Sequence, residues 1–242
     1  MRLDLYLTEN GKYASRTRAE RAVKAGCVKV NGRTETRCSA EVSDADEIAC
    51  LPDPLKYVSR GGLKLEFALD HFGVDVEGKT AIDVGASTGG FTQVLLERGA
   101  ANVLAVDVGR DQLDPSLKSD RRVTSLEKTD VRSLDPETTG LFDILTCDCS
   151  FISLKEILPA AGRLMKSSSK GIFLIKPQFE VGRAKVGKKG VVKDKSAREK
   201  SVAVIIEAAE ALGFRASKPA VESPITGGDG NVEYLVLLEK ET

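Results

Sequence analysis

Short apolar runs alternate with longer amphipathic segments in the larger part of the chain, from Thr80 onward. The segment Phe91–Arg98 has helical spacing, whereas the apolar runs are four to seven residues long, as expected of strands. The predicted strands cover residues 81–84, 103–107, 142–148, 172–176 and 233–238. This alternation predicts a Rossmann-like α/β fold, in which a mostly parallel sheet carries helices on both faces.

The first 50 residues have a different pattern. Ser15 opens a helix-like run that continues to Ala25 and stops at Gly26; serine is a favourable N-cap and glycine a favourable helix terminator. Apolar and polar residues then alternate over Val28–Thr34, and Asn31-Gly32 inside this run is a strong signal for a two-residue hairpin turn. The pattern predicts a small α+β unit.

The segment Leu51–Pro54 separates the two patterns. Its two prolines in four residues restrict the backbone and end regular structure. We therefore predict a small domain over residues 1–55 and a larger domain over residues 56–242, whose own pattern begins near Tyr57.

The composition indicates a soluble chain with a substantial core. Of 242 residues 41% are hydrophobic, enough to bury a core. No stretch approaches the roughly 18 consecutive apolar residues of a membrane-spanning helix, and the N-terminus lacks the pattern of an export signal; we expect a cytoplasmic protein. Five cysteines without a CxxC pair and one histidine, His71, indicate reduced thiols and no metal site.

Basic residues are concentrated in two regions, although the formal net charge is zero. Residues 1–40 carry nine Lys and Arg against four Asp and Glu, and residues 166–200 carry eleven against three. Local basic patches attract polyanions even when the total charge cancels, and the glycine-containing loop 182–195 could clamp an RNA backbone. A solvated basic helix and a solvated loop are the alternatives.

The N-terminal region resembles a small RNA-binding domain shared by a small-subunit ribosomal protein, many pseudouridine synthases and tyrosyl-tRNA synthetases. The match is the basic helix followed by Gly26-Cys27-Val28-Lys29-Val30-Asn31-Gly32. Side chains at intervals of three share one helix face, so Arg18, Arg21 and Lys24 can act together. The candidate RNA-binding residues of the whole chain are Arg16, Arg18, Arg21, Lys24, Lys29, Arg60, Lys185, Lys188 and Lys189.

A glycine-rich turn follows the first predicted strand of the larger domain. It has a Gly-x-x-x-Gly-Gly pattern, unlike the Gly-x-Gly-x-x-Gly dinucleotide loop, and it lacks the Gly-Lys-Ser/Thr end of a phosphate loop. Asp107 ends the next strand, 22 residues after Gly85, where an acid can accept hydrogen bonds from ribose hydroxyls. A tight strand-to-helix connection would also favour glycine.

With Asp83 ahead of the turn and a third acid further on, this arrangement resembles the S-adenosylmethionine site of Rossmann-like methyltransferases, where the third acid or its neighbour faces the adenine. The candidate cofactor-binding residues are Asp83, Gly85, Ala86, Ser87, Thr88, Gly89, Gly90, Phe91, Asp107, Val108, Asp130 and Val131.

Further motifs extend the resemblance to the whole chain. They are Tyr57-Val58-Ser59-Arg60-Gly61-Gly62-Leu63-Lys64-Leu65, Asp148-Cys149-Ser150-Phe151-Ile152-Ser153-Leu154, Ile175-Lys176-Pro177-Gln178-Phe179-Glu180-Val181-Gly182, Ser223-Pro224-Ile225 and Gly230-Asn231-Val232-Glu233. The chain resembles the TlyA family, often labelled hemolysin A, of rRNA 2′-O-methyltransferases, whose catalytic domain is similar to the FtsJ methyltransferases.

This resemblance implies a seven-stranded class I methyltransferase domain, S-adenosylmethionine as cofactor, and ribosomal RNA or ribosomal subunits as partners, with a cytidine ribose as target. It also implies a Lys-Asp-Lys-Glu tetrad, which carries over to Lys64, Asp148, Lys176 and Glu233.

A ribose hydroxyl is a poor nucleophile, whereas the sulfonium methyl is already activated, so the enzyme has to align the reactants and remove a proton; no metal is required. Lys176 is the candidate base if burial and a neighbouring cation such as Lys64 favour its neutral form. Asp148 would orient Lys176, although alone it favours the charged amine. Glu233 would position Lys64, which could also hold the target phosphate or hydroxyl. The alternatives are that the lysines are solvated and that Glu233 only occupies an edge strand. Asp148 and Lys176, however, both end strongly apolar strands of a parallel sheet, where ligands bind.

Other functions remain open at this point. Cys149 allows a carbon-five scheme with a cysteine nucleophile, but the Pro-Cys setting of that class is absent, and the Asp/Asn-Pro-Pro-Tyr/Phe motif of amino-group methyltransferases is absent too. A binding module that grips RNA without catalysis is a second hypothesis. A membrane-active toxin is a third, although the sequence has no extended membrane element.

Overall fold

The computed structural model describes residues 1–13, 15–24, 26–50, 56–227 and 229–241. The chain divides into two compact units, Met1–Val58 and Ser59–Thr242. The segment Leu51–Pro54, on which the domain boundary was predicted, lies outside the described residues. Each unit is described by itself.

The first unit combines two helices with a three-stranded sheet in the order β2-β1-β3. Asn31 and Gly32 both have positive φ, 52° and 78°, and Val30 pairs with Arg33, so the predicted two-residue hairpin is confirmed. The Ser15 hydroxyl accepts a hydrogen bond from the Arg18 amide at 3.3 Å, as a helix cap does. The elements are α1 (Leu3–Glu9), α2 (Arg16–Lys24), β1 (Val28–Val30), β2 (Arg33–Thr34) and β3 (Ile48–Cys50).

A separate apolar core holds this unit together. It contains Leu3, Leu7, Ala19, Ala22, Val23, Cys27, Val28 and Val42. The buried carboxylate of Asp4 accepts hydrogen bonds from Arg2 at 2.9 Å and from Arg16 at 2.8 Å. Because Arg16 lies on α2, this contact joins the two helices.

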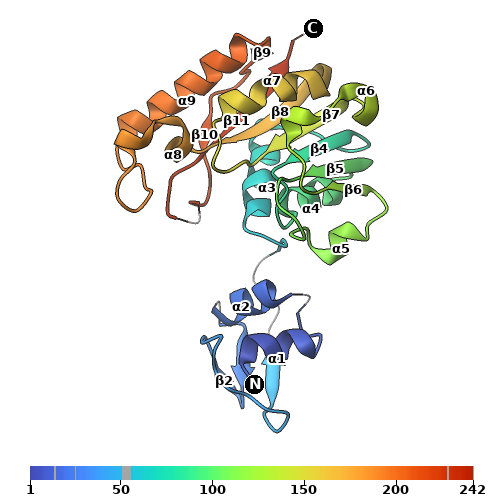
Figure 1. Cartoon of the computed structure of the whole chain (residues 1–242), viewed down its shortest axis with the longest axis vertical. Coiled ribbons are helices and arrows are strands. Elements are labelled where there is room, and N and C mark those ends of the chain that lie inside the picture. Colours follow the sequence, from blue (N-terminus) through green and yellow to red (C-terminus); the bar gives the residue numbers. More distant parts are fainter. Residues whose placement is uncertain (14, 25, 51–55, 228, 242) are drawn as a thin grey trace. The chain divides into compact units, whose positions relative to one another are not determined.

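The second unit is built on one large sheet with strands in the order β10-β11-β8-β7-β4-β5-β6 (Figure 1). The five strands from β6 to β8 are parallel, and β11 runs antiparallel to β8. The strands are β4 (Thr80–Val84), β5 (Asn102–Val106), β6 (Val123–Leu126), β7 (Phe142–Cys147), β8 (Met165–Ile175), β9 (Phe214–Arg215), β10 (Val221–Glu222) and β11 (Tyr234–Lys240).

The predicted Rossmann-like class is confirmed, with one correction. The sheet has eight strands instead of seven, because the short strand β9 also pairs with β11. Both β9 and β10 contain two residues, which is too short for a hydrophobic period to be seen in the sequence.

Helices cover both faces of the sheet (Figure 1). The helical elements are α3 (Gly61–Phe72), α4 (Gly90–Glu97), α5 (Pro115–Lys118), η1 (Val131–Ser133), α6 (Pro136–Thr139), α7 (Leu154–Leu164), α8 (Pro177–Glu180), η2 (Arg183–Lys185) and α9 (Lys195–Glu210). No helix among the described residues is both long and apolar enough to cross a membrane.

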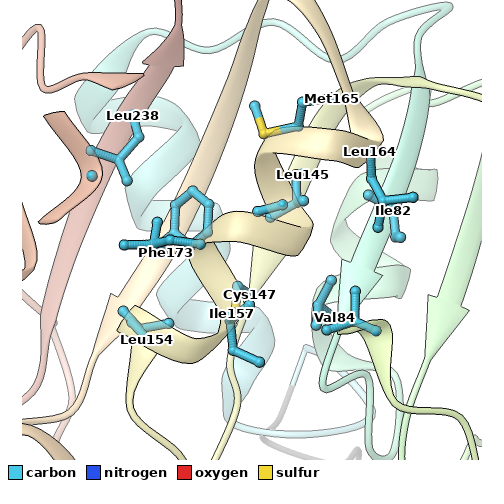
Figure 2. Packing of buried hydrophobic residues seen from close by; sticks show 14 of the residues in the cluster. Ile82, Val84, Leu145, Cys147, Leu154, Ile157, Leu164, Met165, Phe173 and Leu238 are labelled. Carbon is cyan, nitrogen blue, oxygen red and sulfur yellow. The ribbon is translucent and has the colours of Figure 1, made fainter. Parts of the chain in front are cut away.

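Alternate residues of the central strands enter the main core (Figure 2). Ile82 and Val84 of β4 and Leu145 of β7 pack with Ile157 of α7, while the residues between them face the opposite side, as the two-residue period of a strand requires. Asp83 and Thr146 therefore share the other face of the sheet.

The strand order places a topological switch point at β4. The chain passes from β4 to β5 on one side and later returns to β7 on the other side. At such a point the loops after neighbouring parallel strands diverge, and ligands bind in the crevice at their carboxyl ends. The loops after β4, β5 and β7 are therefore the places to look for a site.

Candidate active site

A cavity of about 430 Å³ lies at the carboxyl ends of β4, β5 and β7. Ligand pockets for drug-sized molecules have volumes of roughly 300–1,000 Å³. The lining residues are Val84, Gly85, Ser87, Val106, Asp107, Val108, Gly109, Gln112, Thr129, Asp130, Val131, Asp148, Cys149, Ser150, Phe151, Ile152 and Ile157. The cavity therefore opens at the switch point of the sheet.

The glycine turn forms one wall of the cavity. Gly85 has φ of 80°, and a Cβ atom there would lie 2.9 Å from the carbonyl oxygen of Asp148. Only glycine adopts this positive φ easily and also lacks the Cβ atom, so only glycine fits here without displacing the backbone. The Ser87 amide donates to Oδ2 of Asp107 at 2.7 Å, so the turn is fastened to the end of the neighbouring strand.

Two of the candidate cofactor-binding acids, Asp107 and Asp130, stand on the cavity wall. Asp107 also accepts a hydrogen bond from the Gly109 amide at 2.7 Å, which fixes the loop after β5. Asp130 forms an ion pair with Arg132, 2.6 Å between Oδ2 and Nη2, and hydrogen bonding to this guanidinium lowers the pKa of Asp130. Val108 is 72% exposed although it lines the cavity, so it offers an open apolar surface there.

Half of the predicted cofactor residues do not line the cavity: Asp83, Ala86, Thr88, Gly89, Gly90 and Phe91. A Cβ atom at Gly89 would lie 2.3 Å from Leu117, and one at Gly90 would lie 2.1 Å from the hydroxyl of Ser59. These glycines permit close packing of protein against protein.

Asp83 is buried below the turn. Its two carboxylate oxygens accept hydrogen bonds from Thr92 of α4 at 2.7 Å and from Thr146 of β7 at 2.9 Å. Burial raises the pKa of Asp83 to about 6, against the opposing effect of the two threonine hydroxyls. The carboxylate therefore ties α4 to the sheet.

Lys176 and Asp148 meet at the edge of the cavity. The ammonium of Lys176 lies 2.7 Å from Oδ1 of Asp148 and donates a hydrogen bond to the Ser150 hydroxyl at 2.7 Å. Lys176 directly follows β8 and is 8% exposed, whereas lysine is almost never buried unless it is paired. A buried ammonium thus stands beside two cavity-lining residues.

Lys64 and Glu233 form a second buried ion pair, 2.6 Å between Nζ and Oε2. Glu233 immediately precedes β11, in which Tyr234 lies opposite Ile175 of β8. Glu233 and Lys176 therefore leave the paired strands at the same end. The four predicted tetrad residues thus form two ion pairs at one edge of the sheet.

The loop after β7 contributes cavity residues that the sequence analysis did not single out as ligand-binding. Ser150 bonds Lys176, and Phe151 is 92% exposed with φ of 65°. The ring of Phe151 lies 5.3 Å from that of Phe179, measured between centroids. Positive φ in a bulky residue is a genuine outlier, and no sequence pattern predicts it. Gln112 and Thr129 are further lining residues that no motif identified.

The candidate RNA-binding residues belong to both units. Of the helix residues, Arg16 is bound to Asp4 and lies 3.2 Å from Glu20, and Arg21 donates to the carbonyl of Val58 at 3.1 Å. Lys24 is exposed and Arg18 and Lys29 are half-buried. In the second unit all four candidates, Arg60, Lys185, Lys188 and Lys189, are exposed.

The turn that carries Lys188 and Lys189 is held by a buried asparagine. Asn231 donates to the carbonyl of Gly190 at 2.9 Å and accepts from the amide of Val192 at 3.0 Å. This basic turn is therefore fastened to the loop that leads into Glu233. Among the described residues, no group of three or more His, Cys, Asp or Glu could hold a metal ion.

The fold and this site place the chain in the class of Rossmann-like methyltransferases that carry an additional domain of an RNA-binding type. The FtsJ-like methyltransferase family profile matches residues 57–240, and the S4 domain profile matches residues 1–48. The chain belongs to the TlyA (hemolysin A) family, whose catalytic domain is an FtsJ-like methyltransferase. The family and fold expected from the sequence are thus confirmed.

Relatives that match over nearly the whole chain support this family assignment. The 16S/23S rRNA (cytidine-2′-O)-methyltransferase TlyA of Mycobacterium tuberculosis is 42% identical over 243 residues, covering 100% of this chain and 90% of that protein. Hemolysin A of Brachyspira hyodysenteriae is 40% identical over 237 residues, covering 97% of this chain and 98% of that protein. A solved structure of a candidate hemolysin from Streptococcus thermophilus superposes with a TM-score of 0.79 at 42% identity, covering 100% of this chain and 88% of that one.

Proposed function

We propose that this chain transfers a methyl group from S-adenosylmethionine to the ribose 2′-hydroxyl of a cytidine in ribosomal RNA. The observation that carries the proposal is the buried ammonium of Lys176, bonded to Asp148 at the rim of the cavity. A relative of 42% identity is named for this reaction. Such a substrate would place the enzyme with the ribosomes in the cytoplasm.

The cavity residues fit an S-adenosylmethionine molecule. Asp107, at the end of β5, would accept hydrogen bonds from the ribose hydroxyls, and Asp130 or Val131 would face the adenine, with Val108 offering apolar contact. Gly85 lines the cavity, where a side chain would displace the adjoining backbone of Asp148. When bound, the cofactor would supply an activated methyl group as its sulfonium.

The four polar side chains would then position the target hydroxyl and accept its proton. Lys176 would first release one ammonium proton to solvent and would then, as the neutral amine, accept the proton of the ribose hydroxyl as its oxygen takes the methyl group; Asp148 and Ser150 would fix the direction of the amine. Lys64, oriented by Glu233, would hold the target hydroxyl or its phosphate. General base catalysis of this type contributes about 10²–10⁴-fold.

Basic groups would supply the affinity for RNA. We propose that the domain over residues 1–55 grips RNA through Arg18, Arg21, Lys24 and Lys29, and that the domain over residues 56–242 adds the exposed Arg60, Lys185, Lys188 and Lys189. Phosphate contacts make such binding salt-dependent. Arg16, which is already paired with two acids, would contribute less than the other arginines.

The test is methyl transfer from labelled S-adenosylmethionine to rRNA or ribosomal subunits, with cofactor affinity measured by calorimetry. We expect the wild-type chain to transfer the label. Lys176→Ala should lower the rate of transfer by at least about 100-fold. Its affinity for the cofactor should stay within about 3-fold of the wild-type value, which is a change of less than about 1.4 kcal/mol in binding free energy. Salt-dependent RNA binding without cofactor binding would identify a binding module instead, and leakage of liposomes by the pure protein would identify a membrane-active one.

A carbon-five methyltransferase is a second candidate because Cys149 is one of the residues that line the cavity. That chemistry requires a cysteine nucleophile. The buried neighbour Cys147 is a poor choice, because its hydrogen bond with Cys149 and its burial raise its pKa. Cys149→Ala separates the schemes: it keeps methyl transfer if a ribose is the target and abolishes transfer if a base carbon is.

A further inference from the structure

The loop between β7 and α7, residues 148–153, is gripped at both ends by one short turn of the chain. This turn runs from Lys176 through α8 to Glu180. Lys176 holds the first part of the loop through an ion pair with Oδ1 of Asp148 and a hydrogen bond donated to the Ser150 hydroxyl. The two sequence motifs that contain these residues are distant along the chain and contact each other here.

Glu180 holds the other end of the loop. Its Oε2 accepts a hydrogen bond from the Ser153 hydroxyl at 2.5 Å, and its Oε1 accepts one from the Leu154 amide at 2.9 Å. Leu154 is the first residue of α7, where backbone amides have no partner within the helix. Both carboxylate oxygens are used, and burial raises the pKa of Glu180.

The middle of the loop is strained and would not keep its conformation unaided. Phe151 has φ of 65° and its ring is 92% exposed, with a contact to Phe179 of the same α8 turn. A bulky residue stays in this region only where its surroundings fix the backbone on both sides. Lys176 holds the loop before Phe151 and Glu180 holds it after Phe151.

Resting on the proposed function, we propose that Glu180 is a positioning residue for methyl transfer, which holds loop 148–153 so that Asp148 and Ser150 meet Lys176. Glu180 does not line the cavity and would act only through the loop. Misplacement of reacting groups by about 1 Å can cost on the order of 100-fold in rate, so the loss of this grip has a measurable effect.

The variants are Glu180→Ala, which removes both hydrogen bonds, and Glu180→Gln, whose amide can accept from Leu154 and donate to the oxygen of Ser153. The matched control is Asp143→Ala. Asp143 also bonds a hydroxyl and an amide, those of Thr80, and in addition Lys166. Thr80, Asp143 and Lys166 lie near the amino ends of β4, β7 and β8, at the opposite edge of the sheet, so the control loses polar contacts without touching the loop.

A reporter of the loop itself avoids dependence on activity. The chain contains no tryptophan and four tyrosines, so Phe151→Trp introduces a single tryptophan at an exposed loop position, which can be excited at wavelengths that tyrosine does not absorb. In this background we expect Glu180→Ala to lower the fluorescence anisotropy of the loop, and Glu180→Gln and Asp143→Ala to leave it unchanged. Without the reporter, we expect Glu180→Ala to lower kcat by about 10- to 100-fold and Glu180→Gln to recover most of it.

Unchanged anisotropy or unchanged kcat in Glu180→Ala would overturn the proposal. So would an equal fall of kcat in Asp143→Ala, or a failure of Glu180→Gln to recover kcat. If Glu180→Ala does not fold, Ser153→Ala takes its place, because it removes one of the two hydrogen bonds of Glu180. This variant must then show a smaller fall in kcat and in the fluorescence anisotropy of the loop. Absence of methyl transfer in the wild type would refute the proposed function, while the anisotropy would still decide whether Glu180 holds the loop.

Discussion

Lys64 and Glu233 lie 169 positions apart in the sequence, yet their ammonium and carboxylate are 2.6 Å apart, and both side chains are buried. Removing one partner leaves the other as a buried unpaired charge, which costs about 3–5 kcal/mol. We expect Lys64→Met and Glu233→Met each to lose about this much free energy of unfolding, measured with urea.

The double variant is the control for this pair. With both charges replaced by an apolar side chain, the double variant should be more stable than the sum of the single losses predicts, because no unpaired charge remains. Strict additivity of the two losses would show that the ions do not depend on each other.

The pKa of Asp83 gives a pH dependence with a definite sign. Burial raises this pKa from 3.8 to about 6, so between these values the folded chain binds a proton that the unfolded chain has released. The contribution of Asp83 to the free energy of unfolding is fully present below about pH 4. It falls by roughly 3 kcal/mol as the pH rises to about 6. Because other carboxylates titrate as well, the quantity to measure is the difference between wild type and Asp83→Asn.

We expect Asp83→Asn to gain stability relative to wild type as the pH rises through this window, and the difference to stay constant above it. Urea unfolding at a series of pH values measures it. A difference that does not change between about pH 4 and pH 7 would contradict burial of an ionisable Asp83.

Phe151 provides a test of backbone strain. At φ of 65° a non-glycine residue costs about 1–2 kcal/mol, and little apolar burial is lost because the ring is 92% exposed. Phe151→Gly should therefore be more stable than Phe151→Ala by about 1 kcal/mol, as measured by thermal unfolding. Equal stability of the two variants would mean that the loop relaxes out of this conformation.

Asp107 should be needed for the cofactor and not for RNA. Losing a hydrogen bond to a charged group costs about 1.5–3 kcal/mol, so Asp107→Ala should weaken S-adenosylmethionine binding by at least about 10-fold in calorimetry while RNA affinity is retained. Asp120→Ala is the control, because Asp120 bonds Arg122 outside the cavity. A similar loss of cofactor affinity in the control would argue against a specific role of Asp107.

The sequence predicted the parts of the fold that depend on local pattern. Apolar strands such as Ala81–Val84 and the Asn31-Gly32 hairpin are local signals, and the structure has them. Helix α1 gave no such signal, because Leu3, Leu5 and Leu7 alternate as in a strand. The helix places Leu3 and Leu7 in the core one turn apart and pairs Asp4 with Arg16 of α2, which are tertiary contacts.

The site was predicted in its residue types more fully than in its geometry. Strand ends located Asp107 and Asp148 at the cavity, since the carboxyl ends of parallel strands share one edge of the sheet. A turn has two sides, however, and the sequence does not tell which residues line the cavity: Gly85 does, whereas Gly90 packs against Ser59. The pairings of Lys176 with Asp148 and of Lys64 with Glu233 were expected from the family resemblance, and the coordinates add their distances of 2.7 and 2.6 Å and their burial.

The most direct measurement is the identity of the nucleoside that receives the label. After incubation of rRNA with the chain and labelled S-adenosylmethionine, the RNA is digested and its nucleosides are separated by mass spectrometry. The proposed function predicts label in 2′-O-methylcytidine, absent with Lys176→Ala and present with Cys149→Ala. Label on a base carbon or amino group, or no label on any rRNA-containing substrate, would contradict it.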